Sequence, residues 1–397
     1  MKKIINVFEV FAGVGSQLRA LKNIEEELGV EIKSLGLVEW YIDAIVSYQT
    51  IHSHEEKNSY VSKEVMISEL QQLTLSKDSK IPVSKNYFTK QNEEKLTKYY
   101  QYCLPFIETL KNPNSEKLYY TDINKVNVIP KDIDIFTYSF PCQDLSQQGN
   151  QLGIQEDTRS GLLLQVKRIL KQNKDRLPKT LLMENVKSLT NKKFISEFED
   201  WIKFLKELGY TSTWKVINST DFGSAQNRER VFMVSKLNKK AYNWPVKIKH
   251  NKTLKNILDT DSEITNQVLE LTSKIKRKGI TEFKTTSNNI TKAFIKDWSN
   301  FNSENYVYKN EGFGPTLTAS GANSRLKFYF KNKDIFRYIN YQEAFKYMGF
   351  TKQDANKIMK TNLVSENKII FMAGNSISVE VLEHIFKNLI CEIKKEF

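Results

Sequence analysis

An apolar run followed by a glycine turn and an amphipathic pattern opens the chain, and this order restricts the fold more than any other feature. Residues 4–12, IINVFEVFA, have the length and apolar character of a buried strand. After Gly13-Val14-Gly15, apolar residues recur at helical spacing over 17–28. A strand, a tight turn and a helix in this order predict a βα unit.

The same alternation continues along the chain. Further strands are predicted over 34–39, 133–139, 180–183, 214–218 and 231–235, with helices over 162–170 and 194–208. Such alternation predicts an α/β fold with a mixed, mostly parallel sheet and helices on both faces. Near the C-terminus we expect a strand over 368–373, a turn at 374–376 and a closing helix over 379–393.

Charge is unevenly distributed along the 397 residues. The chain has 60 Lys+Arg against 46 Asp+Glu, a net charge of +14. Residues 236–333 alone hold 19 basic and 8 acidic residues, an excess of 11 positive charges. This charge favours a polyanionic partner, although a merely cationic surface would give the same composition.

These shifts in composition divide the chain. We expect a catalytic α/β domain over 1–235, completed by 367–397, and a smaller, basic, loop-rich domain over 236–366, with little helical periodicity in 236–333. Residues 55–118 form a polar insertion in the first domain, and no role for it can be assigned from its residues.

Cysteine, histidine and hydropathy patterns exclude several classes of protein. Three cysteines lack a C-x-x-C spacing, which argues against a disulfide framework, and four scattered histidines do not form a zinc pattern, so no metal is expected. The first apolar run is interrupted by Asn6 and Glu9 and is too short for a secretory signal. No stretch approaches the ~18 apolar residues of a membrane span. We therefore expect a soluble, cytoplasmic protein without a membrane partner.

Residues suited to chemistry follow the predicted strands. The Gly-x-Gly turn together with Glu39, an acidic residue at the end of the second strand, favours an adenosine-containing cofactor. Cys142 stands behind a proline in SFPCQDLS and is placed as a nucleophile, although a buried structural thiol is the alternative. Glu184, in the motif MENV, follows the apolar run 180–183. The segment QNRER supplies cations at the edge of the sheet, although these could equally form surface ion pairs. A thiolate, a carboxylate that can hold a proton and an arginine suit covalent activation of an electron-poor ring followed by group transfer.

The ordered motifs FAGVG, VEW, TDI, SFPCQDLS, RSGLL, MENV, QNRERV and GNS closely resemble those of the cytosine-C5 DNA methyltransferases over nearly the whole chain. The resemblance implies a Rossmann-like methyltransferase domain that uses S-adenosylmethionine and releases S-adenosylhomocysteine. It implies a cofactor site made of Phe11, Gly13, Val14, Gly15, Glu39, Trp40, Asp122, Ile123, Pro141, Leu162, Asn375 and Ser376.

By the same resemblance, Cys142 attacks C6 of the cytosine, Glu184 contacts N3 and the exocyclic amine, and Arg230 holds the O2 side. Arg228 is assigned to the catalytic site and shapes it together with Gln226. The target base must flip out of the duplex, and residues 143–159 are the expected lid. The residues expected to contact DNA are Gln143, Ser146, Gln226, Ser320, Gly321, Ala322, Asn323 and Arg325.

More specifically, the chain resembles the CpG-specific enzymes of mollicute bacteria. The segments that carry this resemblance are SFPCQDLSQQG, TRSGLL, LLMENV, FNSENYVY and GPTLTASGANSR. It implies double-stranded DNA as the substrate, CpG as the site and the basic domain as the target-recognition domain. The small side chains of 320–323 suggest a loop that reads the dinucleotide, with an ordinary turn as the alternative. Arg337 and Glu343 are expected to be structural.

Departures from the commoner pattern leave other functions open. Ser139-Phe140 replaces a glycine-containing lead-in, Thr121 precedes Asp122 where glycine is frequent, and the long gap from Glu39 to Asp122 weakens the assignment of Asp122. A tRNA cytosine-C5 methyltransferase and a catalytically silent DNA-binding homologue are the alternatives. The resemblance further implies a bacterial, nucleoid-associated monomer and allows a cognate restriction endonuclease acting on the same site.

Overall fold

The computed structural model describes residues 2–53, 61–141, 161–319 and 325–395. The chain forms two compact units. Unit 1 contains Met1–Ile217, Glu229–Pro245 and Leu382–Phe397, and unit 2 contains Asn218–Arg228 and Val246–Val381. The polypeptide therefore passes between the units four times.

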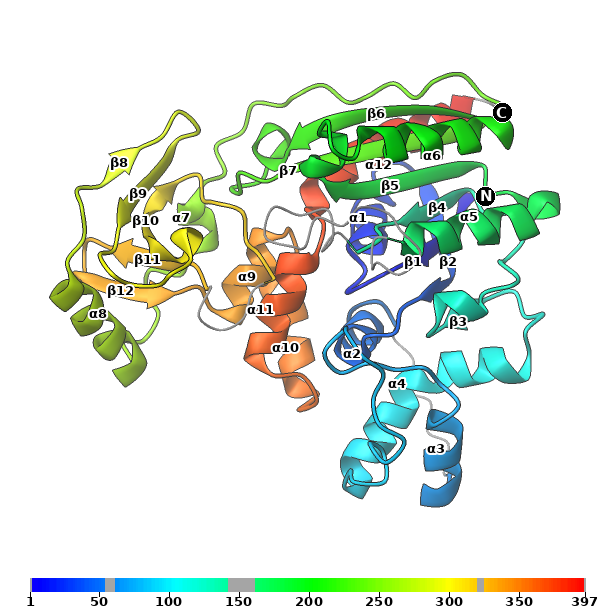
Figure 1. The fold of residues 1–397 in the computed structure, drawn as a ribbon, viewed down its shortest axis with the longest axis horizontal. Helices are drawn as coiled ribbons and strands as arrows, with labels where there is room; N and C mark the ends of the chain where they lie inside the picture. Colours follow the sequence, from blue (N-terminus) through cyan, green and yellow to red (C-terminus); the bar gives the residue numbers. More distant parts are fainter. Residues whose placement is uncertain (1, 54–60, 142–160, 320–324, 396–397) are drawn as a thin grey trace. The chain divides into compact units, whose positions relative to one another are not determined.

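A seven-stranded sheet forms the centre of unit 1, in the order β3-β2-β1-β4-β5-β7-β6 (Figure 1). The strands are parallel in each pair from β3 to β5, and β7 runs antiparallel to β5. This confirms the mixed, mostly parallel sheet. The strands are β1 (Lys3–Val10), β2 (Val30–Val38), β3 (Leu118–Tyr120), β4 (Ile135–Tyr138), β5 (Thr180–Val186), β6 (Tyr210–Asn218) and β7 (Glu229–Leu237).

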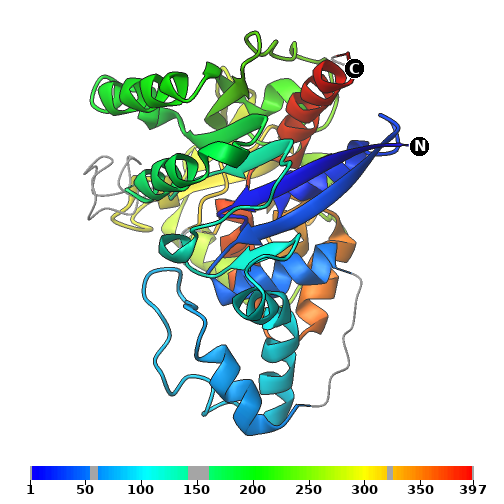
Figure 2. The ribbon, with the colours of Figure 1, turned by 90° about the vertical axis from the view of Figure 1, so that its right-hand side faces the viewer.

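Helices cover both faces of this sheet, as expected. Figures 1 and 2 show α5 (Leu162–Gln172) and α6 (Ile195–Glu207) on one face, and α1 (Ser16–Ile24) and α12 (Val379–Lys395) on the other. The core under α5 and α6 is aromatic: Trp201 donates to the Tyr138 hydroxyl at 2.9 Å, and both side chains are buried. Burial of such large side chains is the main stabilising contribution here.

The insertion forms a helical pair beside the β3 edge of the sheet. The pair consists of α3 (Lys63–Leu70) and α4 (Glu93–Lys111). Helix α2 (Ile42–His52), which precedes the insertion, lies at the same end of unit 1 (Figure 2). Helix α4 packs on β3. The rings of Phe106 and Tyr119 meet edge to face with their centroids 5.6 Å apart, and the Thr109 hydroxyl accepts the Tyr119 N–H. The insertion is thus packed against the sheet.

One predicted strand is wrong. Residues 368–373 lie inside helix α11 (Glu366–Asn375), not in a strand. Ile369, Ile370, Met372 and Ala373 are buried, and this spacing places them on one side of a helix. An apolar run this short does not distinguish a buried strand from a helix. The expected closing helix is confirmed as α12.

Unit 2 contains a five-stranded sheet in the order β12-β11-β10-β9-β8. Its elements are α7 (Leu254–Ile257), α8 (Asn266–Lys278), β8 (Lys284–Thr285), β9 (Ile290–Phe294), β10 (Tyr306–Gly312), β11 (Lys327–Phe330), β12 (Ile335–Tyr338), α9 (Tyr341–Tyr347), α10 (Lys352–Lys360) and α11. The expectation of little helix was wrong for α8, whose buried residues Leu271, Thr272 and Ile275 face β12. Its weak hydropathy pattern comes from the charged residues that fill the rest of the helix.

Arg337 and Glu343 form a buried ion pair inside unit 2. The guanidinium donates to both carboxylate oxygens, at 2.6 and 2.8 Å. Glu343 also completes a capping box with Asn340 at the start of α9. The pair therefore joins β12 to α9, and its expected structural role is confirmed.

Among the described residues, no single helix is long and apolar enough to cross a membrane, although α11 and α12 meet that test together as a bent pair. The same part of the chain contains no cluster of three potential metal-binding side chains.

Candidate active site

The glycine loop after β1 has an unusual backbone. Phe11, Gly13 and Gly15 all have positive φ angles, of 59°, 57° and 79°. A Cβ on Gly15 would lie 2.4 Å from Nε2 of His52, so only glycine fits there. A Cβ on Gly13 would meet no heavy atom within 4 Å, so the loop is open at that point. An open loop with free access to backbone is suited to binding a ligand.

A buried carboxylate that the sequence analysis did not assign lies beneath this loop. Glu9 on β1 is fully buried, accepts the Tyr48 hydroxyl at 2.6 Å and accepts the Leu18 N–H at 3.2 Å. Burial raises the pKa of Glu9 to about 7, against the lowering effect of these two hydrogen bonds. Tyr48 also contacts His52, whose Nε2 lies 3.2 Å from the Val14 carbonyl. Glu9 thus links β1, α1 and α2 under the loop.

Glu39 joins the glycine loop to the end of β2. One carboxylate oxygen accepts the Gly13 N–H at 2.8 Å, and the other accepts the N–H groups of Trp40 and Tyr41, each at 2.8 Å. Burial raises the pKa of Glu39 above its usual value, although the three backbone donors partly oppose this effect. A carboxylate has about four acceptor positions, so about one remains for a ligand hydroxyl.

Asp122 and Ile123 lie in a turn after β3. Asp122 begins the short 3₁₀ helix Ile123–Lys125, and its Oδ1 accepts the N–H and the side-chain amide of Asn124, both at 3.0 Å. Its Oδ2 accepts no hydrogen bond from any described residue. Arg168 of α5 holds the turn by donating to the Ile123 carbonyl at 2.9 Å. The free oxygen could accept from an amino group.

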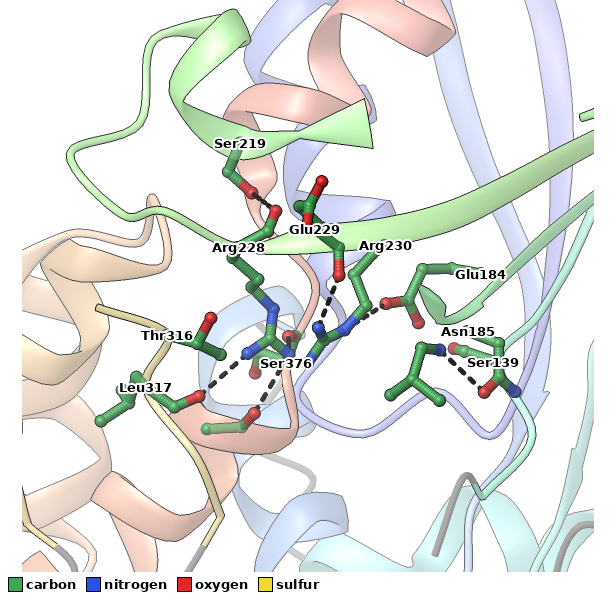
Figure 3. Close-up of polar contacts among 12 residues, drawn as sticks. Ser139, Glu184, Asn185, Ser219, Arg228, Glu229, Arg230, Thr316, Leu317 and Ser376 are labelled. Carbon is green, nitrogen blue, oxygen red and sulfur yellow. Dashed lines mark hydrogen bonds and ion pairs between the residues drawn. The ribbon is translucent and has the colours of Figure 1, made fainter. Parts of the chain in front are cut away.

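Glu184 and Arg230 face each other on neighbouring antiparallel strands. The register pairs Val186 of β5 with Arg230 of β7. Arg230 Nε lies 3.3 Å from Glu184 Oε1, and the two side chains are 18% and 10% exposed (Figure 3). Arg230 also donates to the Glu229 carbonyl at 2.8 Å. Because both groups are mostly buried, their charges interact more strongly than a surface pair would.

Asn185, another residue without an assigned role, connects β5 to the segment that leads to Cys142. Its side-chain amide donates to the Phe140 carbonyl at 3.1 Å and its oxygen accepts the Val186 N–H. The described part of this segment ends at Pro141. Cys142, Gln143, Ser146 and the expected lid lie outside the described residues, as do Ser320, Gly321, Ala322 and Asn323.

The other two cysteines differ in environment. Cys103 in α4 is buried, and burial raises its pKa to about 12, which disfavours the thiolate. Cys391 on α12 is exposed. Cys103 is therefore a structural thiol.

Gln226 and Arg228 are engaged within unit 2. The Gln226 side chain is fully buried, donates to the Tyr347 carbonyl at 3.2 Å and accepts the Leu317 N–H at 2.9 Å. Arg228 donates to the carbonyls of Leu317 and Ser376, each at 2.9 Å (Figure 3). Both side chains tie the 218–228 segment to the rest of unit 2, and direct contact with a base stays a prediction for each.

The remaining predicted residues are scattered over the fold. Leu162 begins α5 and is partly exposed, and Arg325 lies 3.9 Å from Glu366 in unit 2. Asn375 is exposed at the end of α11, and Ser376 is buried and donates to the Met372 carbonyl at 2.8 Å. Asn375 and Ser376 belong to unit 2, and their part in the cofactor site stays a prediction.

Comparison with known proteins gives consistent results. A family model described as C-5 cytosine-specific DNA methylase matches residues 70–391. The chain is 43% identical over 396 residues to the orphan methyltransferase M.SssI of Spiroplasma monobiae, covering 98% of this chain and 97% of that protein. It is 32% identical to the type II methyltransferase M2.ScrFI of Lactococcus lactis subsp. cremoris, covering 97% of this chain and 99% of the relative.

Solved structures support the same fold. The Dnmt2 methyltransferase of S. pombe aligns with a TM-score of 0.58 at 15% identity, covering 98% of this chain and 99% of that one. The family model covers most of the chain and the relatives cover nearly all of it. The chain therefore belongs to the C-5 cytosine-specific DNA methylase family and is a DNA (cytosine-5-)-methyltransferase.

Proposed function

We propose that this enzyme methylates C5 of a flipped-out cytosine within CpG in double-stranded DNA, with Cys142 as the nucleophile. The observation that carries the proposal is the Glu184–Arg230 pair at 3.3 Å on neighbouring strands. Glu184 lies on β5. From the same strand, the Asn185 side chain donates to the carbonyl of Phe140, which is two residues before Cys142.

The family uses S-adenosylmethionine as its methyl donor, and the residues around the glycine loop fit this molecule. Gly13 is open to an approaching ligand, and Glu39 keeps about one acceptor position for a ribose hydroxyl. The Oδ2 of Asp122 suits the adenine amino group, with Trp40 and Ile123 beside it. When bound, the cofactor supplies an electrophilic methyl group.

The protein side chains then act on the pyrimidine ring. The Cys142 thiolate forms a bond to C6, and the ring electrons move toward C5, which becomes nucleophilic. Glu184 holds the positive charge at N3, while Arg230 holds the O2 side. After C5 is methylated, its proton is lost to a base, the Sγ–C6 bond breaks and the thiolate leaves.

Glu184 and Arg230 have matched roles in this scheme. Arg230 fixes one oxygen of Glu184, so the carboxyl group is oriented before the base arrives. Because both side chains are mostly buried, water competes less for their hydrogen-bonding atoms. Arg228 and Gln226 act as positioning residues through their contacts within unit 2.

Recognition of DNA is assigned to residues 236–366, with Arg325 and the 320–323 loop at the base edges. The excess of 11 positive charges over 236–333 supports binding to phosphates. CpG rests on the resemblance in SFPCQDLSQQG and GPTLTASGANSR. A soluble, nucleoid-associated monomer, with or without a cognate endonuclease, completes the proposal.

Base-resolution bisulfite sequencing of an unmethylated plasmid incubated with enzyme and S-adenosylmethionine tests the proposal. Protection of every CG and no other cytosine is expected. Protection within a longer motif would contradict the assigned CpG site and keep the chemistry. An unmodified plasmid with methylated tRNA would favour the tRNA alternative, and no methylation of either would favour a silent DNA-binding protein.

A further inference from the structure

The inserted segment reaches both turns that the proposed function assigns to the adenosine half of the cofactor. These turns are Trp40–Tyr41 after β2 and Thr121–Lys125 after β3. Between helices α3 and α4 of the insertion, residues 73–76 make hydrogen bonds to both of them. We call residues 73–76 the connector.

The connector pairs with the first turn through its backbone. The Ser76 N–H donates to the Trp40 carbonyl at 2.8 Å, and the Ile42 N–H donates to the Ser76 carbonyl at 2.9 Å. This is a short parallel bridge between Tyr41 and Ser76. Ser76 is fully buried, and its hydroxyl donates to the Ile81 carbonyl at 2.6 Å. The backbone on both sides of Tyr41, the residue directly after Trp40, is thereby fixed.

The connector pairs with the second turn through side chains. The Thr74 N–H donates to the Thr121 hydroxyl at 3.1 Å, and Lys125 donates to the Thr74 hydroxyl at 3.1 Å. Thr121 is 7% exposed and directly precedes Asp122. The connector therefore donates one hydrogen bond to the residue before Asp122 and accepts one from Lys125, three residues after it.

The insertion also anchors the connector from the other side. Lys77, the next residue, pairs with the fully buried Asp43 of α2 and lies over the ring of Tyr99 in α4. Tyr99 packs with Tyr87 and the buried Phe88. Leu73 and Leu75 of the connector are buried as well. Lys77 thus ties the end of the connector both to α2 and to an aromatic cluster of the insertion.

We propose that the connector is a positioning element of the adenosine site, and that the insertion sets the affinity of this enzyme for S-adenosylmethionine. It orders Trp40 and Asp122 before the cofactor binds, which reduces the entropy lost on binding. This inference rests on the proposed function, because it assigns the adenine to these two turns. Thr74, Ser76 and Thr121 act through Trp40 and Asp122 and do not themselves contact the cofactor.

The test is binding of S-adenosylhomocysteine to the full chain by titration calorimetry. Thr121→Val keeps the side-chain shape and leaves the Thr74 N–H without its acceptor. Thr74→Val is the milder second variant, because it removes only the bond to Lys125. Thr97→Val is the matched control: Thr97 lies in α4 of the same insertion, and among the described residues its hydroxyl bonds to the Glu93 carbonyl of its own helix alone.

We expect Thr121→Val to weaken binding of S-adenosylhomocysteine about fivefold or more, the factor that corresponds to one neutral hydrogen bond. Thr74→Val should weaken it by a smaller factor, and Thr97→Val should not change it. In turnover assays the KM for S-adenosylmethionine should rise while the KM for DNA stays constant. Inhibition by free adenosine should weaken by the same factor, because the change is local to the adenine end.

Three results would overturn the inference. If the wild type binds S-adenosylhomocysteine and Thr121→Val binds it within twofold, with an unchanged melting temperature, the connector does not position the site and the proposed function stands. If Thr121→Val raises the KM for DNA as much as that for the cofactor, its role is only structural. A wild-type chain that binds no S-adenosylhomocysteine would contradict the proposed function as well.

Discussion

Replacing Glu9 with glutamine should remove a pH dependence of stability that is built into unit 1. Glu9 is fully buried and its pKa is raised from 4.5 to about 7. Between these two values the unfolded chain releases its proton while the folded protein keeps it, so stability falls as the pH rises. Above pH 7 the folded protein carries a buried carboxylate, which within the described part of the chain accepts hydrogen bonds from Tyr48 and the Leu18 N–H.

The size of the effect follows from the interval between the two pKa values. At about 1.4 kcal/mol per pH unit, the interval corresponds to about 3 kcal/mol. Most of this, about 2 to 3 kcal/mol, should be lost between pH 5 and pH 8 in the wild type. Glutamine keeps the shape and an acceptor for the Leu18 N–H, and it does not titrate, so Glu9→Gln should not show the loss.

Hydrogen exchange of the β1 amides measures this difference. Wild type and Glu9→Gln are compared at the same pH, so the intrinsic exchange rate cancels. The ratio of protection in Glu9→Gln to protection in the wild type should be higher at pH 8 than at pH 5. Glu31→Gln, a change of an exposed carboxylate on β2, is the matched control. Equal pH profiles for wild type and Glu9→Gln would refute the reasoning.

The other predictions concern catalysis and binding. Cys142→Ser should abolish methylation and the covalent adduct with 5-fluorocytosine-containing duplex DNA, with DNA binding retained in a gel-shift assay; normal turnover would exclude the thiol mechanism. Glu184→Gln should lower kcat by about 10²- to 10⁴-fold with little change in the Kd for DNA, as single-turnover assays would measure. Gly15→Ala places a Cβ 2.4 Å from the His52 ring and should weaken S-adenosylhomocysteine binding in calorimetry, whereas equal affinity would show that the loop adapts. The logarithm of the DNA association constant should fall linearly with the logarithm of salt concentration, and a flat response would exclude the basic residues of 236–333 from the DNA interface.

Strands β1, β2, β4 and β5 of the parallel part were predictable because they contain apolar runs between helices, whereas the three-residue strand β3 was not predicted. β2 and β5 are longer than expected, since their polar ends continue the hydrogen-bonded ladder. The 368–373 segment could not be predicted in the same way. Its apolar run fits a strand or a buried helix equally well, and only tertiary packing selects the helix.

Of the predicted site residues, Glu39 contacts the glycine loop and Glu184 pairs with Arg230, and their roles toward cofactor and base stay predictions. Glu9 was treated only as an interruption of an apolar run, because its partner Tyr48 is 39 positions away. The contacts of Arg228 depend on carbonyl groups of 317 and 376, which no sequence pattern records. Buried polar contacts between distant segments are therefore the part that required coordinates.

The alternation of the chain between the two units has a consequence for biosynthesis. Helix α12 is made after all the other described elements, yet it belongs mainly to the first unit, where Lys3 donates to the Ile393 carbonyl and Lys236 pairs with Glu392. A ribosome must therefore release the chain as far as Lys395 before α12 can cover that face of the sheet of unit 1. Until then apolar strand surface stays exposed to chaperones and to aggregation. A deletion of the last sixteen residues should consequently reduce the yield of soluble enzyme far more than its distance from the catalytic strands would indicate.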